Sequence, residues 1–419
     1  MSSRRRTVLA AIGSTAVFGG GIGYWNRRRI HRRDEINDIN NALKIELQSV
    51  DPPLFISEEH LQSSYHRARD HISKTESLLN TADNVSHGTK LNRAQEELNA
   101  YPPEEIVDSN NRINALEAYR LAVAISGGAR ARAYGDVSGS PSDALRNALD
   151  ALQTELDAVE PQYYGSSLST VVVQCGEADE LYSTAVSQAN RAQNHITDDE
   201  FSNAVTWEIV EQTRQIIHDS SWLFEEREGP DQTDALKATF ERLTDQIKKN
   251  INNVTMHYED GVWSQARGRL LDLKMRTSDS KTQLNAGRVA LAVRDQAIIT
   301  MTTATFDILE QYPAIQELNG TVYRLTDNSD QLIAEKQDAS EAITATVTAV
   351  GDNRLGRCLL TEVIKTADRA DRQLNRLLDN VRSYDQKRWL SGRDSVYLRY
   401  RSSAAEVRAI PDVVALVEA

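Results

Sequence analysis

The sequence predicts an all-α protein: an elongated helical bundle or array with coiled-coil-like seams, preceded by one N-terminal membrane or signal segment. Apolar residues recur every three to four positions along most of the 419 residues, which is the period of an amphipathic helix. The 9 prolines and 20 glycines are few for this length and cluster between these periodic stretches. Aromatic residues make up only 6% of the chain, a composition that suits thin, alanine-rich bundles.

The charge balance limits the classes of partner. The formal net charge is −13, with a pI near 5.2, which excludes attraction of the whole body to nucleic acid or to anionic lipid. Only 11 of the 48 basic residues are lysines. An acidic balance with scarce lysine is similar to that of proteins from salt-loving archaea.

Residues 1–26 are expected to form a signal or membrane-anchor segment. Positions 7–25 carry no charge and follow three consecutive arginines. This segment contains two arginines followed by one residue of any type and two apolar residues, a pattern that resembles the twin-arginine export signal of salt-loving archaeal type. The resemblance implies that the protein is exported. The residues that carry this resemblance are Arg5, Arg6, Val8 and Leu9.

We expect this segment to remain as an anchor, with removal as a signal the alternative. As a helix, positions 7–25 would span about 28 Å, close to the hydrocarbon core of about 30 Å. No Ala-x-Ala site follows the segment. Five arginines between positions 27 and 33 favour a cytoplasmic body by the positive-inside rule, whereas the export resemblance implies the outer face. We expect the protein to be membrane-associated, with the outer face preferred.

Residues 27–56 are expected to form a charged juxtamembrane helix and a linker. Ile36, Ile39 and Leu43 are spaced to share one helix face. The pair Pro52-Pro53 then ends the helical pattern.

Residues 57–229 are expected to form a first helical bundle. Ser57 would cap its first helix, and Ser140-Pro141 would begin a later one in the favoured order of cap and N1 proline. Gly127-Gly128 indicates either a kink or a close helix contact. The later helix carries a coiled-coil-like seam. Its members are Leu145, Leu149, Leu152, Leu156 and Val159.

Residues 230–419 are expected to form a second helical bundle with a basic C-terminal region. Gly229-Pro230 is the best candidate domain boundary. We expect long helices over 263–309 and 313–350. The stretch 115–123 loosely resembles 284–293, which indicates either a duplicated half or a chance likeness between alanine-rich helices.

The most regular seam lies near the C-terminus and has two interpretations. Its members are Leu360, Val363, Ala367, Ala370, Leu374, Leu377, Val381 and Tyr384. A homo-oligomer through Leu360, Leu374, Leu377 and Val381 is one interpretation. Packing inside an intramolecular bundle is the other, and we favour it.

No motif predicts a catalytic, cofactor or metal site. The chain has no GxxxxGK[ST] phosphate loop and no GxGxxG between a strand and a helix. The cysteines, Cys175 and Cys358, lie far apart in apolar settings and are expected to be core residues. The nearest approach to a metal cluster is His60, His66, Asp70 and His71. We expect these four to be solvated polar positions.

The region 354–408 carries 13 basic and 7 acidic residues in an otherwise acidic chain. Aromatic and cationic side chains alternate in it, a mixture that suits an anionic lipid surface, an acidic partner or single-stranded nucleic acid. The candidate anionic-partner patch is Arg388, Trp389, Arg393, Arg399, Tyr400 and Arg401. The alternative, which we favour, is that the aromatics are packed while the arginines pair with nearby acids.

Three functions are compatible with these observations. The first is a membrane-tethered, non-catalytic interaction or scaffold protein whose partners are other proteins. Its charge and expected location predict that it does not bind nucleic acid. The second is an extracytoplasmic ligand-binding or sensory module with a pocket between helices. The third is an anionic surface or polymer binder that uses the basic C-terminal region.

Overall fold

The computed structural model confirms the all-α class. It describes residues 36–50, 53–81, 88–106, 109–134, 142–197, 203–225, 228–254, 264–306, 330–380, 383–384 and 386–419. Within these ranges there is no strand, and the single β-type feature is an isolated bridge between Tyr164 and Asp231. None of the helices in these ranges has the length and apolar character needed to cross a membrane. The expected N-terminal segment, with its twin-arginine residues, lies outside the described residues.

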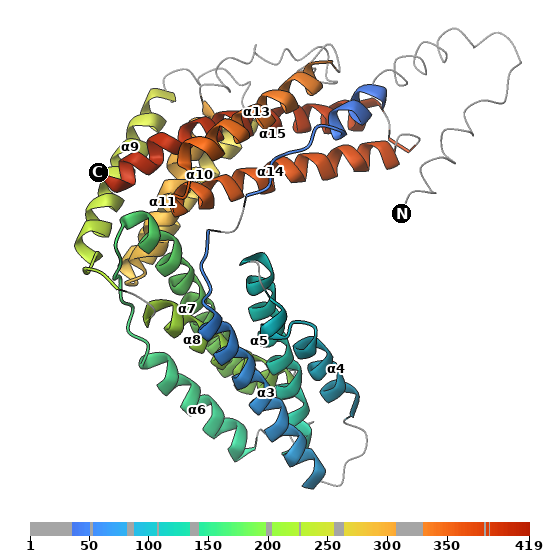
Figure 1. Ribbon diagram of the computed structural model, residues 1–419, viewed down its shortest axis with the longest axis vertical. Helices are drawn as coiled ribbons and strands as arrows, with labels where there is room; N and C mark the ends of the chain where they lie inside the picture. Colours follow the sequence, from blue (N-terminus) through green and yellow to red (C-terminus); the bar gives the residue numbers. More distant parts are fainter. Residues whose placement is uncertain are drawn as a thin grey trace, which may run out of the picture.

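Residues 58–225 form one bundle, whereas the helix at residues 36–43 lies beside the second half of the chain (Figure 1). Residues 36–43 are helical, and this helix ends before residue 50, earlier than the expected break at the proline pair. The bundle that follows comprises α3 (Glu58–Thr81), α4 (Gly88–Asn99), the short 3-10 helix η2 (Pro103–Glu105), α5 (Ser109–Ala133), α6 (Asp143–Asp157), α7 (Leu168–Thr197) and α8 (Asn203–Glu225).

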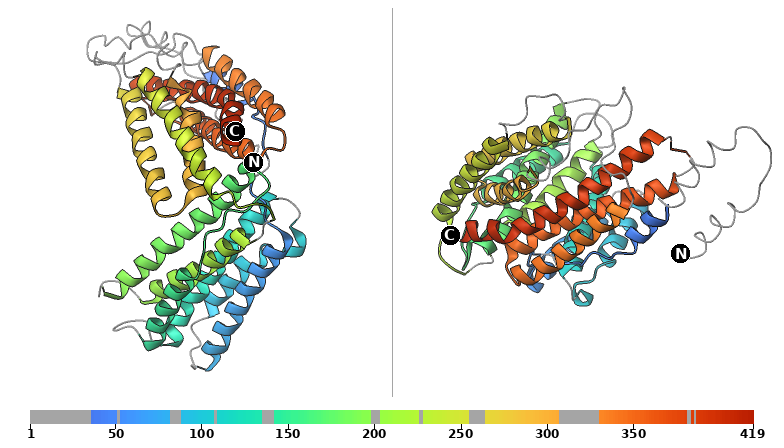
Figure 2. Two further views of the ribbon diagram at one scale, coloured as in Figure 1. Left: turned by 90° about the vertical axis from the view of Figure 1, so that its left-hand side faces the viewer. Right: turned by 90° about the horizontal axis from the view of Figure 1, so that it is seen from above.

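The second half forms another bundle, which Figure 2 shows stacked on the first. It comprises α9 (Thr233–Val254), α10 (Ser264–Asn285), α11 (Val289–Thr303), α13 (Asp330–Val350), α14 (Arg354–Asp379) and α15 (Gln386–Glu418).

The two halves share one continuous apolar core. Helix α7 packs on α11 and α14, and it also touches α15 and α9. A single cluster of buried apolar side chains includes residues of both bundles, from Leu61 of α3 to Val417 of α15. A small second cluster, of Ile247, Leu273, Ile299 and Phe306, joins α9, α10 and α11. The chain therefore passes from the first bundle to the second near the expected boundary at Gly229-Pro230, but the two bundles share one core.

The helices of the two halves pack in the same order. In the first half α3 and α4 pack on α5, α5 packs on α8, and α6 and α7 pack on α8. In the second half α9 and α10 pack on α11, α11 packs on α15, and α13 and α14 pack on α15. The stretch 115–123 lies in α5 and much of 284–293 lies in α11, which are corresponding helices. This order is what an internal duplication would produce.

The structure corrects one of the long helices that we expected. Instead of one helix over 263–309, the chain ends α10 at Asn285 and begins α11 at Val289. Gly287 between them has φ +80°, a left-handed conformation that glycine adopts without steric cost. The Arg288 N–H then donates to the Gln283 carbonyl (3.0 Å), which closes the end of α10. The sequence pattern missed this turn because apolar periodicity continues on both sides of it.

Helix starts are set by local caps. The Ser57 hydroxyl accepts from the His60 N–H (3.1 Å), as expected for the cap of α3. Helix α6 begins slightly later than expected, because its cap is Ser142, whose side chain accepts from the Leu145 N–H. Ser140 and Pro141 lie outside the described residues.

Gly127 marks a close helix contact. Helix α5 is continuous through this position and packs against α8. A Cβ at position 127 would lie 2.8 Å from the Trp207 carbonyl oxygen of α8, so only glycine lets the two backbones come this close. Of the two interpretations of Gly127-Gly128, the close contact is confirmed.

The C-terminal seam packs inside the chain. Six of its members, Leu360, Val363, Ala367, Ala370, Leu374 and Leu377, are at most 2% exposed. Helix α14, which carries them, packs mainly on α15, and the Gln373 side-chain amide donates to the Gly392 carbonyl of that helix (3.2 Å). Val381 lies outside the described residues. Leu360, Leu374 and Leu377 are therefore covered within one chain.

Pro411 lies inside α15 and leaves one backbone acceptor without its helical donor. A proline has no N–H, so the carbonyl four residues before it loses its usual hydrogen bond. That carbonyl belongs to Val407, and it accepts from the Thr346 hydroxyl of α13 (3.3 Å). The neighbouring helix thus satisfies the acceptor that the proline exposes.

Candidate functional site

A buried carboxylate joins three helices of the first bundle. Asp219 of α8 is fully buried. Its Oδ2 accepts from the Arg120 Nε of α5 (2.6 Å), and its Oδ1 accepts from the Ser64 hydroxyl of α3 (2.7 Å). The His60 Nε2 of α3 lies 3.3 Å from the same Oδ1. Burial alone would raise the pKa of Asp219, but the Arg120 charge and the contacts with His60 and Ser64 hold it well below its usual range.

A second carboxylate, Glu211, repeats this arrangement two turns away on α8. The Arg130 Nη1 of α5 donates to its Oε1 (2.9 Å), and Arg214 Nη1 lies 3.4 Å from the same atom. The His71 Nε2 of α3 lies 3.1 Å from its Oε2. Burial would raise the pKa of Glu211, but His71 and the two guanidinium groups lower it to about 2.

Helix geometry explains why the pattern repeats. Each layer takes one histidine from α3, one acid from α8 and one arginine from α5. The interval of 11 residues on α3 is close to three whole turns, so the two histidines lie on one helix face. The intervals of 8 residues on α8 and 10 on α5 leave the members of each pair about a quarter turn apart. The acids are engaged in ion pairs that hold the helices together.

Our expectation for the histidines was wrong at two positions. His66 and Asp70 are exposed, as expected. His60 is fully buried, and the His71 side chain is only 11% exposed. Both face acids on α8, more than 130 residues away in the chain. The signal that could have found them was the interval of 11 residues, which places both histidines on the face that carries the buried Leu61 and Ile72.

A third buried acid lies where the two halves meet. Asp179 of α7 is fully buried, and its Oδ2 accepts from the Leu291 N–H in the first turn of α11 (3.1 Å). The Tyr163 hydroxyl lies 3.1 Å from Asp179 Oδ1 and accepts from the Val289 N–H (3.0 Å). Burial raises the pKa of Asp179 to about 7, although the hydrogen bonds from α11 and Tyr163 oppose the shift.

The residues of the candidate anionic-partner patch do not form one continuous surface. Trp389, Arg393 and Tyr400 are at most 3% exposed. Arg399 is half-buried. Arg401 lies 3.2 Å from the Tyr397 hydroxyl and 3.8 Å from Glu335. The burial of Trp389 and Tyr400 and the contact of Arg401 with Glu335 agree with packed aromatics and paired arginines. The side chain of Arg388 lies outside the described residues, so the role of the patch as a whole stays a prediction.

Tyr400 belongs to a buried cluster beneath this region. Its hydroxyl donates to Asp371 of α14, and the Lys336 ammonium of α13 lies 2.8 Å from Asp371 Oδ1. Lys336 is fully buried and lies 5.6 Å from the centre of the Tyr400 ring. The cluster links α13, α14 and α15, so these residues serve packing of the second bundle.

Neither cysteine forms a disulfide. Cys175 is buried and Cys358 is half-buried. Burial raises the pKa of the Cys358 thiol to about 11, which disfavours the reactive thiolate. Among the described residues, no three or more histidine, cysteine or acidic side chains are grouped so as to hold a metal ion.

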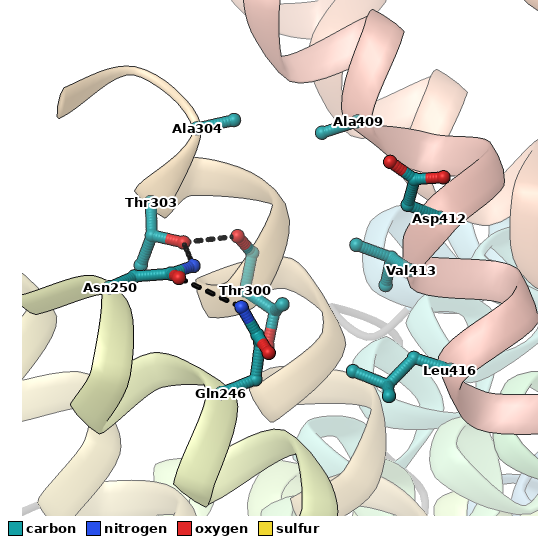
Figure 3. Close-up of a pocket in the computed structure, with 9 residues that line it drawn as sticks. All are labelled: Gln246, Asn250, Thr300, Thr303, Ala304, Ala409, Asp412, Val413 and Leu416. Atoms are coloured by element: carbon teal, nitrogen blue, oxygen red, sulfur yellow. Dashed lines mark hydrogen bonds between the residues drawn. The ribbon is translucent and has the colours of Figure 1, made fainter. Parts of the chain in front are cut away.

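The second bundle contains a cavity of about 340 Å³ between α9, α11 and α15 (Figure 3). This volume is at the lower end of the range for small-molecule sites. It is lined by Gln246, Asn250, Thr300, Thr303, Ala304, Ala409, Asp412, Val413 and Leu416. Polar side chains of α9 and α11 form one wall, and α15 forms the opposite wall with three apolar residues and one acid.

Hydrogen bonds order the polar wall. The Gln246 amide donates to Asn250 Oδ1 (2.8 Å), and the Asn250 amide donates to Thr303 Oγ1 (2.7 Å). The Thr303 hydroxyl donates to the Thr300 carbonyl (2.6 Å), and the Thr300 hydroxyl donates to the Gln296 carbonyl (2.8 Å). These bonds form a chain from α9 to α11, so the polar groups are held in place without a ligand. Sequence analysis missed this site because its residues come from three helices that are far apart in the chain.

Comparison with known proteins gives one partial match. Residues 233–419 match a family model described as "Domain of unknown function (DUF8264)". The match covers α9 to α15 and therefore includes the cavity. It begins close to the expected boundary at Gly229-Pro230. No curated protein and no solved structure matches the chain.

Proposed function

We propose that this protein is a non-catalytic helical module that binds a small polar molecule in the cavity between α9, α11 and α15. The observation that carries the proposal is the ordered polar wall, which faces a cavity of a size that suits a small ligand. A passive scaffold has no need of such a wall. The geometry therefore favours the ligand-binding interpretation over the scaffold interpretation.

The buried acids support the non-catalytic part of the proposal. Asp219 and Glu211 are bound by arginines and histidines of neighbouring helices, and their lowered pKa values keep them ionised. A general acid or base needs a pKa near the working pH, which neither group has. Asp179 does have a pKa of about 7, but it is fully buried and bonded to Tyr163 and to the first turn of α11, so a substrate cannot reach it. Their contacts suit a rigid framework that positions helices.

A membrane tether completes the proposal. It is supported by the uncharged stretch 7–25 and the arginines on both sides of it. The export resemblance of Arg5, Arg6, Val8 and Leu9 favours a body on the outer face, where a binding module would sample molecules outside the cell.

The proposal is tested by thermal-shift screening of the full chain against a library of small polar metabolites. The expected result is a saturable rise in melting temperature with at least one compound, since a ligand that binds only the folded state stabilises it. The matched variant is Ala409→Phe, whose ring would occupy the cavity from the α15 wall opposite Ala304 (Figure 3). This variant should keep the helical circular dichroism spectrum and lose the shift. Absence of stabilisation by every compound, or an equal shift in the variant, would overturn the proposal.

A further inference from the structure

The cavity contains more hydrogen-bond acceptors than donors. A threonine hydroxyl has one proton to donate, and the hydroxyls of Thr300 and Thr303 give theirs to carbonyls of their own helix. Toward the cavity these two oxygens can therefore act only as acceptors, and Thr303 Oγ1 has one lone pair left there because it already accepts from the Asn250 amide. Gln246 and Asn250 each use one amide proton within the wall, which leaves one N–H of each amide for a ligand.

The opposite wall adds a negative charge. Asp412 is exposed and lies on α15, the wall opposite the polar side chains (Figure 3). It is the one ionisable side chain among the described residues that line the cavity. Arg242, one turn before Gln246, has a guanidinium that donates instead to Thr239 Oγ1 (2.8 Å) and to the Val417 carbonyl (3.4 Å). The cavity therefore presents a carboxylate that its own lining does not neutralise.

Resting on the proposed function, we infer that the ligand is a small ammonium compound. An ammonium group has three N–H donors, no acceptor and a positive charge. It matches two acceptor-only hydroxyls on one wall and a carboxylate on the other. The apolar side chains Ala409, Val413 and Leu416 would contact the carbon skeleton of such a compound. An anionic ligand would meet the Asp412 charge without a compensating cation from the lining.

Isothermal titration calorimetry on the full chain tests this inference with matched pairs of probes. Putrescine is compared with 1,4-butanediol, and glucosamine with glucose. The first pair exchanges two ammonium groups for hydroxyl groups, and the second pair exchanges one. We expect at least one ammonium probe to bind about tenfold more tightly than its hydroxyl partner, or better, because charge-assisted hydrogen bonds are the stronger kind.

Variants assign the effect to the cavity. Asp412→Asn keeps the shape of the side chain and removes its charge, so it should weaken binding of the ammonium probe by about tenfold or more. Thr303→Val removes an acceptor at similar volume and should also weaken binding. Asp234→Asn is the matched control, because Asp234 is a fully exposed acid at the start of α9, remote from the lining. It should bind as the unaltered chain does.

The outcomes separate the inference from the proposed function. The ammonium class would be overturned if the hydroxyl probes bound as tightly as their ammonium partners and Asp412→Asn did not change the affinity. That result would not contradict the proposed binding function. Equal weakening by Asp412→Asn and Asp234→Asn would overturn the inference, since it would indicate general attraction of cations to an acidic protein. The absence of binding by all four probes overturns the ammonium class, whereas the binding function itself is rejected only by a negative library screen.

Discussion

The contact between α5 and α8 can be tested by replacing Gly127 with alanine. The added Cβ would lie 2.8 Å from the Trp207 carbonyl oxygen and 3.1 Å from the Cβ and Cγ of Glu211. The carbonyl is a backbone atom, so relief of the clash requires α8 to move away from α5. Overpacking of this kind costs about 1–3 kcal/mol. The higher helix propensity of alanine offsets about 1 kcal/mol. We therefore expect the free energy of unfolding to fall by up to about 2 kcal/mol.

Gly128→Ala is the matched control. The three atoms nearest to its Cβ would all belong to the side chain of Glu208, whose Cγ would be 2.7 Å away and which can rotate. The rotation would break an ion pair between Glu208 and Lys90 (2.7 Å), in which both side chains are more than one-third exposed. Such pairs contribute at most about 1 kcal/mol, which the gain in helix propensity of about 1 kcal/mol offsets. We expect little change in the stability of this variant.

Urea unfolding of both variants, followed by far-ultraviolet circular dichroism, measures the difference. The unaltered chain and both variants should start from the same helical signal, and the midpoint should fall only for Gly127→Ala. If the two variants lose equal stability, or if Gly127→Ala is the more stable, then α5 and α8 do not approach as closely as the structure indicates.

Three further predictions concern buried polar groups. Burial raises the pKa of Asp179 to about 7, so its contribution to stability is complete below about pH 3.8 and is lost as the pH rises through 7, by up to about 4 kcal/mol. Asp179→Asn has no carboxyl group to titrate at this position, so urea unfolding of the variant across this pH range should not show that loss. The pKa of Glu211 is lowered to about 2, so its ion pairs stabilise the fold fully above about pH 4.5 and are lost on acidification. Glu211→Gln should therefore lower the free energy of unfolding by about 3–5 kcal/mol at neutral pH. A decrease below about 1 kcal/mol in urea unfolding would contradict the ion-pair assignment. Thr346→Val leaves the Val407 carbonyl beside Pro411 without a donor and should lower the unfolding free energy by about 1–3 kcal/mol; an unchanged thermal midpoint would argue against this hydrogen bond.

The sequence predicted the parts of the fold that depend on local pattern. The seam from Leu360 to Leu377 recurs at helical spacing, and its burial follows from that spacing. Ser57 was recognisable as a cap because a cap needs only its own helix. Local pattern failed at Gly287, where helical periodicity continues across a turn whose glycine has positive φ.

The sites could not be predicted because they depend on contacts between distant segments. His60 resembles a surface residue until Asp219 is known to lie beside it. The cavity likewise requires α9, α11 and α15 to meet, and the residues of its polar wall are ordinary on each helix. Thr300 and Thr303 become acceptors only because their hydroxyls bond to helix carbonyls, which a sequence pattern does not report.

The packing of α7 on α11 has a consequence for any attempt to divide the chain. Gly176 of α7 lies against Ala290 and Arg294 of α11, so a cut before residue 233 would uncover this face of the family-matched segment. Asp179 would also be removed from the first turn of α11, which would leave the Leu291 N–H without its carboxylate acceptor. Expressed alone, residues 233–419 would expose this apolar surface of α11 to water, and the first turn of α11 would be less stable. The intact polypeptide should instead melt cooperatively, as a single thermodynamic unit.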